Sequence, residues 1–313
     1  MKPDVLVLQE IRPDQMKQLE AAYTLHRYDQ VGDPDALLAE VGDKIEAVVT
    51  SGGSGITRAQ IERMPNLKIA SLSSVGYDTV DLAACNDHGV TVTNTPDVLN
   101  DDVADTAIML LLAVQRGLVK GDAYARSGEW AKSGPMPLLR STRGKKLGVV
   151  GLGRIGKAIA ERATPFGLNI VYHGRNKQDA VDYPYYADLK EMAQDVDIMI
   201  VITAGGEGTR GLISKDVIEA LGPDGALINV SRGTVVDEPA MIEALQSGKL
   251  GAAGLDVFLN EPDIDPAFAA LENVTLYPHH ASGTIETRAA MSQLVVDNLA
   301  AHFAGKPLLT PVN

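Results

Sequence analysis

A glycine-rich turn near the middle of the chain constrains the fold most. The apolar run 146–150 leads directly into Gly151-Leu152-Gly153-Arg154-Ile155-Gly156, and a helical pattern from Ile155 to about Phe166 follows. In a G-x-G-x-x-G turn the first glycine permits the tight bend, the second lets backbone approach a pyrophosphate, and the third lets helix pack on strand. The first helical N–H groups would face the phosphates. The pattern predicts a dinucleotide-binding unit, with a purely structural turn as the alternative, and it leaves a domain-sized stretch in front of it.

Composition restricts the class of protein. A chain of 313 residues exceeds one typical core, so we expect two domains. The net charge of −13 argues against nucleic-acid and anionic-membrane partners. Cys85 is the one cysteine, which excludes an intrachain disulfide and fits a reducing cytosol. The longest apolar run, Ala107 to Val114, is too short to span a bilayer, and the apolar run 5–8 is too short for a signal peptide. We expect a cytoplasmic protein with no metal.

Strand-like and helical runs alternate along the chain, which predicts an α/β fold with parallel sheets. The expected strands are 5–8, 47–50, 69–72 and 90–93 in a first series, and 146–150, 169–173, 198–202, 226–230, 254–257 and 274–277 in a second. Helical patterns lie near 13–22, 34–41, 57–64 and 79–88.

Two further helices and an irregular segment complete the pattern. A long helix is expected over 101–120, and a last helix, from about Thr284 to Phe303, has the helical apolar spacing that would let it pack on the first series. The segment Tyr124 to Arg143 lacks periodicity and is expected to be irregular. Its Trp130 either caps a local core or contacts a second subunit.

The residues after the second strand of the fingerprint unit predict the cofactor. An NAD-binding unit has a carboxylate about 20 residues after its fingerprint, to hydrogen-bond the ribose hydroxyls. This chain has His173-Gly174-Arg175-Asn176-Lys177 there instead, with no acid. Arg175 and Lys177 offer positive charge to a 2′-phosphate, and arginine suits phosphate through its planar fork. The pattern favours NADP(H) over NAD(H), with a solvated basic loop as the alternative.

Three chemically useful residues follow expected strands of the second series. Arg232 follows strand 226–230, Glu261 lies after Asp256-Val257-Phe258, and His279 follows strand 274–277. Because carboxyl ends of parallel strands lie on the ligand side of a sheet, these side chains form a coherent set. Arginine can bind a carboxylate or a carbonyl, histidine can transfer a proton near neutral pH, and a carboxylate can orient that histidine. Taken singly, each also fits a structural role: a surface ion pair, a loop charge or a core histidine.

At these residues the chain resembles the D-isomer-specific 2-hydroxyacid dehydrogenases, and within them the NADPH-dependent glyoxylate, hydroxypyruvate and hydroxyphenylpyruvate reductases. The stretches that carry the resemblance are Ser73-Ser74-Val75-Gly76-Tyr77-Asp78, Asn94-Thr95-Pro96-Asp97-Val98-Leu99, the fingerprint, Ser231-Arg232-Gly233, Gly254 to Phe258, and Pro278-His279. The resemblance implies two Rossmann-like, doubly wound domains, with the cofactor domain (99–285) inserted into a flavodoxin-like substrate domain (1–98 and 286–313). It also implies a homodimer built through residues 101–143.

The resemblance implies a role for each candidate residue. Arg232 would bind substrate, His279 would be the general acid and Glu261 would pair with it, while Asp256 would hold the nicotinamide carboxamide. Backbone N–H groups of Val75 and Gly76 would receive the substrate carboxylate, with Ser51, Gly52 and Leu99 bordering the pocket. The further cofactor-binding residues are expected to be Gly151, Leu152, Gly153, Arg154, Ile155, Gly156, His173, Gly174, Arg175, Asn176, Thr203, Val230, Ser231 and Ser282.

Two departures from the family pattern stand out. His280 occupies a usually aliphatic position, so two histidines compete for the acid role, and we assign His279 because it follows the motif's proline. The glycine-rich segment 203–209 replaces the family's usual Leu-Thr-Pro-Glu, which predicts a looser loop. The leading hypothesis is an NADPH-dependent reductase of small 2-keto acids. The alternatives are a formate- or phosphite-type dehydrogenase and a cofactor-sensing regulatory protein on the same fold.

Overall fold

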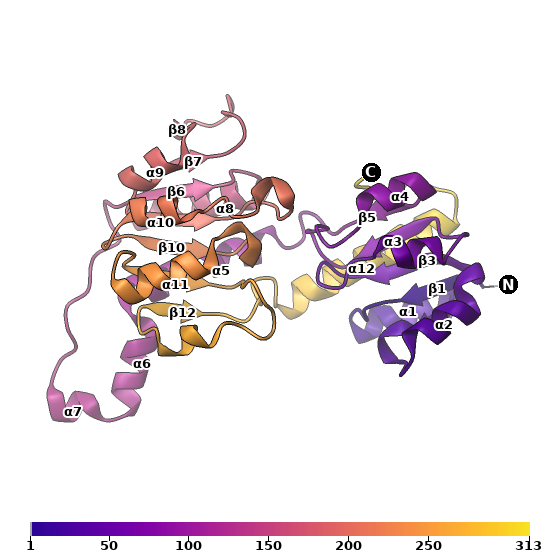
Figure 1. Cartoon of the computed structure of the whole chain (residues 1–313), viewed down its shortest axis with the longest axis horizontal. Helices are drawn as coiled ribbons and strands as arrows, with labels where there is room; N and C mark the ends of the chain where they lie inside the picture. The colour runs from indigo at the N-terminus through magenta and orange to yellow at the C-terminus, as the bar shows by residue number, and fades with distance from the viewer. Residues whose placement is uncertain (1) are drawn as a thin grey trace. The chain divides into compact units, whose positions relative to one another are not determined.

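The computed structural model describes residues 2–313, which form two compact α/β units (Figure 1). The first unit contains the chain up to Leu99 together with Ser282–Asn313, and the second contains Asn100–Ala281. The second unit is therefore inserted into the first. Contacts assign Leu99 and residues 282–285 to the first unit, whereas the sequence-based boundaries placed them in the second.

The first unit is built on a five-stranded parallel sheet with the strand order β2-β1-β3-β4-β5. Its strands are β1 (Asp4–Val7), β2 (Thr24–Arg27), β3 (Ile45–Thr50), β4 (Ile69–Leu72) and β5 (Thr91–Thr93). This is the flavodoxin-like order, so that part of the fold prediction is confirmed. Strand β2 was not predicted, because this edge strand is half exposed and has no apolar run.

Helices cover both faces of this sheet, and the alternation of side chains along β1 explains why. Val5 and Val7 face α1 and α12, while Leu6 faces the opposite layer of α2, α3 and α4. The helices are α1 (Pro13–Ala22), α2 (Pro34–Val41), α3 (Arg58–Glu62), α4 (Leu82–His88) and α12 (Ile285–Phe303). The last helix packs on α1 and β4, as its apolar spacing predicted.

The second unit is built on a seven-stranded parallel sheet with the strand order β12-β11-β10-β9-β6-β7-β8. Its strands are β6 (Lys146–Val150), β7 (Asn169–His173), β8 (Tyr185–Tyr186), β9 (Ile198–Val201), β10 (Ala226–Asn229), β11 (Ala252–Leu255) and β12 (Val274–Leu276). The order reverses at β6, which is the Rossmann arrangement with the ligand side at its topological switch point. The short strand β8 was not predicted.

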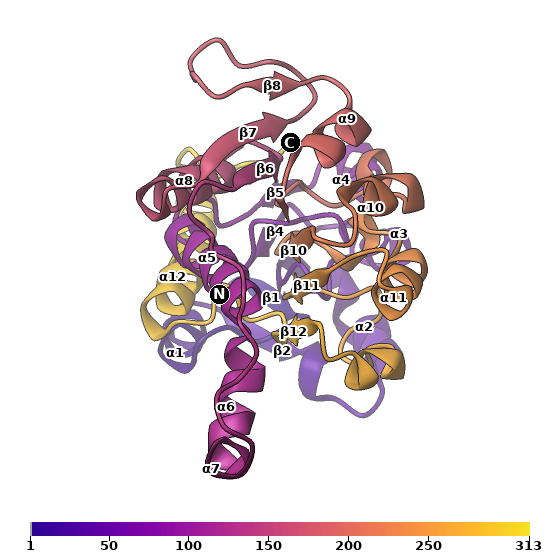
Figure 2. The same cartoon turned by 90° about the vertical axis from the view of Figure 1, so that its left-hand side faces the viewer.

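Helices also flank this second sheet on both faces (Figures 1 and 2). On one face α9, α10 and α11 bury a cluster that includes Met192, Ile218 and Leu245, and on the other α5 packs on α8. The helices are α5 (Asn100–Arg116), α8 (Arg154–Ala163), α9 (Leu189–Asp195), α10 (Lys215–Leu221) and α11 (Glu238–Ser247).

A helical arm extends from the end of α5, away from the second sheet (Figure 2). It consists of α6 (Leu118–Arg126) and α7 (Glu129–Ser133). The expected single helix over 101–120 is wrong, because Gly117 takes a left-handed φ of 54° and divides it. The expected irregularity of 124–143 is wrong over α6 and α7. Trp130 lies on α7 with 65% of its surface exposed, so it does not cap a local core.

No helix within residues 2–313 is long and apolar enough to cross a membrane.

Candidate active site

The fingerprint turn joins β6 to α8 in the form that nucleotide binding requires. Gly151 has a φ of 99°, and a Cβ there would lie 2.8 Å from the carbonyl oxygen of Ile202. A Cβ at Gly156 would lie 2.1 Å from the carbonyl oxygen of Gly151, so only glycine lets α8 pack this closely. Around Gly153 a Cβ would meet nothing within 4 Å, and no side chain caps the helix. Because no side chain caps it, this end of α8 suits an anion.

The loop after β7 carries exposed positive charge. Arg175, Asn176 and Lys177 are exposed, and no carboxylate lies among them. Within residues 2–313 the side chains of Arg175 and Lys177 have no hydrogen bond or ion pair. His173, at the end of β7, is fixed by a hydrogen bond of 3.0 Å between its Nδ1 and the carbonyl oxygen of Tyr186.

The buried hydroxyl of Thr203 indicates whether the fingerprint turn and the basic loop fit a dinucleotide. Thr203 follows β9, and its Oγ1 is buried without a hydrogen-bond partner in the described part of the chain. Its Cγ2 would lie 3.1 Å from a Cβ at Gly151, so it sits beside the fingerprint. An orphaned buried hydroxyl beside an open glycine turn fits a polar ligand. In the glycine-rich loop 203–209 a hydrogen bond joins the two ends: Thr209 Oγ1 donates to the carbonyl oxygen of Ala204 at 2.7 Å.

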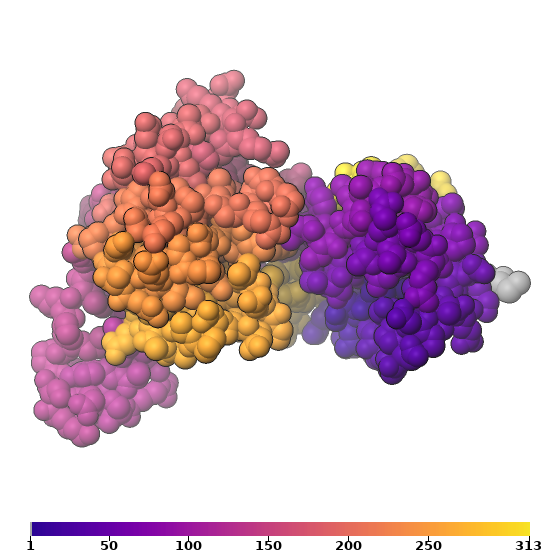
Figure 3. All heavy atoms as spheres, in the orientation of Figure 1, coloured from indigo at the N-terminus to yellow at the C-terminus, as the bar shows by residue number. Residues whose placement is uncertain are grey.

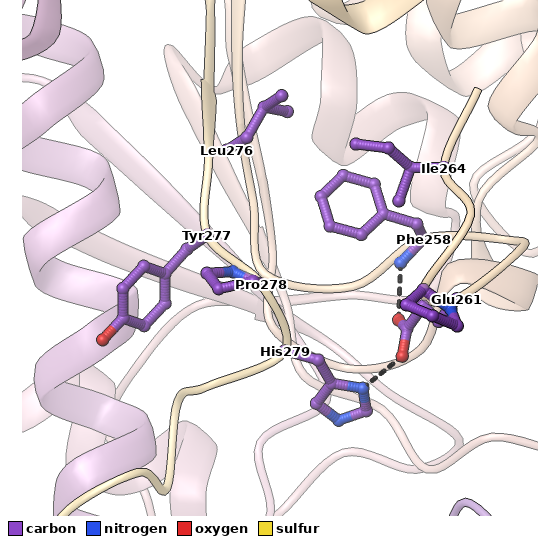
Figure 4. A pocket seen from close by; sticks show the side chains of 8 residues that line it. Phe258, Glu261, Ile264, Leu276, Tyr277, Pro278 and His279 are labelled. Atoms are coloured by element: carbon purple, nitrogen blue, oxygen red, sulfur yellow. Dashed lines mark hydrogen bonds and ion pairs between the residues drawn. The ribbon is translucent and has the colours of Figure 1, made fainter. Parts of the chain in front are cut away.

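A carboxylate–histidine pair lies where β11 and β12 end (Figure 4). Glu261 Oε2 lies 2.5 Å from Nδ1 of His279, and Glu261 Oε1 accepts a hydrogen bond of 2.8 Å from the N–H of Phe258. Burial acts to raise the pKa of Glu261, but these hydrogen bonds and the charges of His279 and Arg232 outweigh it, so the Glu261 pKa lies below its ordinary value. Because an ionised carboxylate only accepts, His279 Nδ1 carries the proton of this bond. Nε2 then points away from Glu261, free for proton transfer.

The backbone around His279 is held by Asp256, through both its carbonyl oxygen and its buried carboxylate. Its N–H donates to the carbonyl oxygen of Asp256 at 2.7 Å, and its φ of 48° is left-handed. The Asp256 side chain, 1% exposed, accepts from the N–H groups of His280 at 2.7 Å and Ala281 at 3.2 Å. Burial, partly offset by those two bonds, raises the pKa of Asp256. Asp256 therefore fixes the turn that aims the His279 ring, a role that the sequence analysis did not assign.

The two adjacent histidines differ in their surroundings. The His279 ring pairs with Glu261, whereas the His280 ring packs edge-on against Tyr277 with ring centroids 6.0 Å apart. Only His279 of these two has the orienting carboxylate.

Arg232 follows β10 on a turn that Asn229 orders. Asn229 Oδ1 accepts from the backbone N–H and the hydroxyl of Ser231, and its Nδ2 donates to the carbonyl oxygen of Arg232 at 3.0 Å. A Cβ at Gly233 would overlap the backbone of Phe258 at 1.9 Å, so the Arg232 turn lies against the Glu261 loop. Sequence reasoning missed Asn229; its place at the end of β10, two residues before Ser231, was the available signal.

An apolar cavity of about 270 Å³ lies beside the carboxylate–histidine pair (Figure 4). Its walls are Phe258, Glu261, Pro262, Ile264, Leu276, Tyr277, Pro278 and His279. Glu238 is a buried acid, 5% exposed, that holds the loop after Phe258: its carboxylate accepts a hydrogen bond of 2.8 Å from the N–H of Leu259. Glu238 was also missed, since a carboxylate that binds a distant backbone N–H leaves no sequence pattern.

In the first unit the two segments predicted to bind substrate, 51–52 and 75–76, lie next to each other. A Cβ at Gly52 would lie 2.8 Å from Ser74 Oγ and 2.9 Å from the carbonyl oxygen of Gly76, so the Ser51-Gly52 turn packs on the Val75-Gly76 loop. Asn94 Nδ2 holds this loop through the carbonyl oxygen of Val75 at 2.9 Å. Within residues 2–313 the N–H groups of Val75 and Gly76 donate no hydrogen bond, so two neighbouring donors are available to an anion.

The predicted residues divide between the two units. Ser51, Gly52, Val75, Gly76, Leu99 and Ser282 belong to the first, and all the others belong to the second. Leu99, Leu152, Val230 and Ser231 are buried. No group of three or more His, Cys, Asp or Glu side chains that could hold a metal ion is found in residues 2–313.

Comparison with known proteins gives a consistent result. Residues 108–281 match the model of the NAD binding domain of D-isomer specific 2-hydroxyacid dehydrogenases. The chain is 48% identical to a hydroxyphenylpyruvate reductase of Plectranthus scutellarioides over 95% of this chain and 94% of that protein. It is 42% identical to a 2-ketogluconate reductase of Gluconobacter oxydans over 99% of each chain.

Among solved structures, it is similar to the NADPH-dependent glyoxylate/hydroxypyruvate reductase of Sinorhizobium meliloti in complex with NADP and malonate. The TM-score is 0.93 with 42% identity, covering 100% of this chain and 97% of that one. The family model spans the fingerprint, Arg232, Glu261 and His279, and the relatives match nearly the whole length. The chain therefore belongs to the D-isomer specific 2-hydroxyacid dehydrogenase family.

Proposed function

We propose that this protein reduces small 2-keto acids, such as glyoxylate and hydroxypyruvate, to D-2-hydroxy acids with NADPH. The observation that carries the proposal is the bond between Glu261 and His279 Nδ1, which leaves Nε2 as a proton donor. A formate- or phosphite-type reaction needs no donor to an oxygen, so an intact Arg–Glu–His set argues against it. The relatives that reduce keto acids support the same reading.

The residues of the second unit would divide the work as follows. NADPH, when bound, would supply the hydride for the keto carbon. His279 Nε2 donates a proton to the keto oxygen, and Glu261 holds the ring in place through its bond to Nδ1. Arg232 binds and polarises the substrate through its guanidinium. Asp256 keeps the 279–281 turn in place and can accept further hydrogen bonds from a carboxamide.

The first unit would bind the carboxylate of the substrate. The unpaired N–H groups of Val75 and Gly76 are the donors, and Ser51, Gly52 and Leu99 border them. Malonate in the Sinorhizobium meliloti structure is itself a small carboxylate, which supports this class of substrate.

The cofactor site would select NADP(H) over NAD(H). The N–H groups at the start of α8, from Gly153 to Gly156, suit the pyrophosphate, and Thr203 supplies its orphaned hydroxyl. Arg175, with Asn176 and Lys177, suits the 2′-phosphate because these side chains are exposed and no acid competes with them. The NADP in the Sinorhizobium meliloti structure supports this choice. His173, Gly174, Val230, Ser231, Asp256 and Ser282 would make the other cofactor contacts.

A substrate panel tests the proposal. NADPH oxidation would be followed with glyoxylate, hydroxypyruvate, 4-hydroxyphenylpyruvate and 2-ketogluconate, and NADH would be run in parallel. We expect turnover with at least one of the small keto acids and a lower KM for NADPH than for NADH. Binding of NADPH without turnover of any of these acids would instead support a cofactor-sensing regulator.

We further propose that the enzyme works in a reducing cytoplasm as a homodimer formed through residues 101–143. Support comes from the single cysteine, Cys85, which is buried and unpaired, and from the exposed apolar side chains of the arm.

A further inference from the structure

The loop that carries Arg175 is held at three points. Tyr185 donates its hydroxyl to the carbonyl oxygen of Gly174 at 3.1 Å, at the start of the loop. At its end the backbone N–H of Gln178 donates to the Tyr172 hydroxyl at 2.7 Å, and the side-chain Nε2 of Gln178 donates to the carbonyl oxygen of Leu152 at 2.7 Å. The exposed basic side chains therefore project from a fixed backbone.

The Gln178 side chain differs from the other two anchors because it joins separate parts of the cofactor site. Leu152 belongs to the fingerprint turn, which precedes Gln178 by 26 positions in the chain. Leu152 is 3% exposed and Tyr172 is 1% exposed, so both partners of Gln178 are buried and fixed. The amide thereby joins the far end of the basic loop to the fingerprint turn by a side chain.

The distance between the fingerprint turn and the basic loop affects the binding of a ligand that has phosphate groups at both. NADPH would contact the turn with its pyrophosphate and the loop with its 2′-phosphate, and a loop fixed in advance avoids the cost of ordering on binding. NADH lacks the 2′-phosphate and depends on the turn. The turn has its own supports, namely the bond from Gly151 N–H to the carbonyl oxygen of His173 at 2.9 Å and the close approach of Gly156.

We propose that Gln178 is a positioning residue for cofactor selectivity: by tying the basic loop to the fingerprint turn, its amide favours NADPH over NADH. The inference rests on the proposed preference for NADPH.

The test is calorimetric titration of the full chain with NADPH and with NADH, which needs no turnover. Gln178→Met keeps the length of the side chain and the backbone bond to Tyr172, but removes the amide. We expect the Kd for NADPH to rise about threefold to tenfold, as for the loss of one preorganised side chain. The Kd for NADH should change by less than about twofold. Gln246→Met, at an exposed glutamine of α11 in the same unit, is the matched control and should change neither.

The possible outcomes separate this inference from the proposed function. An equal rise in the Kd values for NADPH and NADH would mean that Gln178 supports the fingerprint turn itself. No rise in either Kd would mean that the basic loop keeps its position without the amide. Either result overturns the inference. Arg175→Ala is titrated alongside. If Arg175→Ala loses the preference for NADPH while Gln178→Met keeps the wild-type Kd values, the proposed function stands and the inference about Gln178 is rejected. A wild-type protein without NADPH preference rejects both. If Gln178→Met does not fold, Tyr185→Phe removes the anchor at Gly174, keeps the aromatic contact with Tyr172, and should shift the same ratio.

Discussion

At the scale of single residues, His279 and His280 are neighbours in the chain but face different partners. Glu261 orients the His279 ring at 2.5 Å, while Tyr277 packs on the His280 ring. A general acid must keep its donor nitrogen in a fixed direction. We therefore expect His279→Ala to lower kcat by at least ~10² and His280→Ala to lower it far less. Steady-state kinetics of the two variants decide the assignment, and near-equal losses would contradict it.

Glu261 makes a pH-dependent contribution to stability. Its pKa in the folded protein lies below the ordinary 4.5, so the ionised carboxylate binds its partners better in the folded state than in the unfolded chain. That contribution is fully present above pH 4.5 and is lost as the pH falls through the lowered pKa. Urea unfolding of wild type and Glu261→Gln should show a wild-type advantage at pH 6 that shrinks below about pH 4. An advantage that stays constant down to pH 3 would show that ionisation of Glu261 is not its source.

Arg175 should decide affinity for the 2′-phosphate. A charge-assisted contact of this kind is worth roughly 1.5–3 kcal/mol, so Arg175→Ala should raise the KM for NADPH by about tenfold or more. The KM for NADH should barely change. Lys249→Ala, which removes an exposed cation elsewhere in the same unit, controls for the change in net charge. If both KM values rise together, Arg175 supports the fold and does not select the cofactor.

At the scale of elements, Gly153 and Gly156 of the turn between β6 and α8 are expected to have different roles. A Cβ at Gly156 would lie 2.1 Å from the carbonyl oxygen of Gly151, whereas a Cβ at Gly153 would meet nothing within 4 Å. Gly156→Ala should push α8 away from β6, cost about 1–3 kcal/mol of stability and weaken cofactor binding. Gly153→Ala should leave the melting temperature near wild type and weaken binding alone, since it occupies the ligand's side of the turn. Calorimetric melting and NADPH titration measure both; a large fall in melting temperature for Gly153→Ala would contradict this division.

The same elements show how far the sequence predicts the structure. Strands such as β6 and β9 were predicted because both of their faces are buried, which produces continuous apolar runs. The half-exposed edge strands β2 and β8 bury too little apolar surface to show a pattern, and the short α7 has no buried residue. In the candidate site, Arg232, Glu261 and His279 could be found because each follows a strand end. Glu238 and Gln178 could not, because each binds a backbone group distant in the chain, that of Leu259 or Leu152, which becomes its neighbour only after folding. Asn229 binds the local turn 231–232, and its place at the end of β10 was a usable signal.

At the scale of the whole molecule, the arm leaves apolar surface uncovered. In Figure 3 the arm (magenta, lower left) projects beyond the rest of the second unit. The large exposed apolar side chains of α5, the arm and the segment that follows the arm are Met109 at 41%, Leu118 at 61%, Val119 at 56%, Trp130 at 65%, Leu138 at 100% and Leu139 at 50%. Aromatic and Met side chains are favoured at the centre of subunit interfaces, and closed two-fold dimers are the commonest oligomers.

We therefore predict a two-fold homodimer in which the arm of each subunit contacts the other. Light scattering at micromolar concentration should give about twice the chain mass of 33.2 kDa. Trp130→Ala should shift the equilibrium toward monomer, because truncating a large aromatic anchor at such an interface commonly costs about 2 kcal/mol or more. Leu309→Ala, at a side chain 51% exposed in the first unit, is the matched control and should leave the mass unchanged. A stable monomer with full activity would contradict the prediction, since the arm would then have no subunit to cover it.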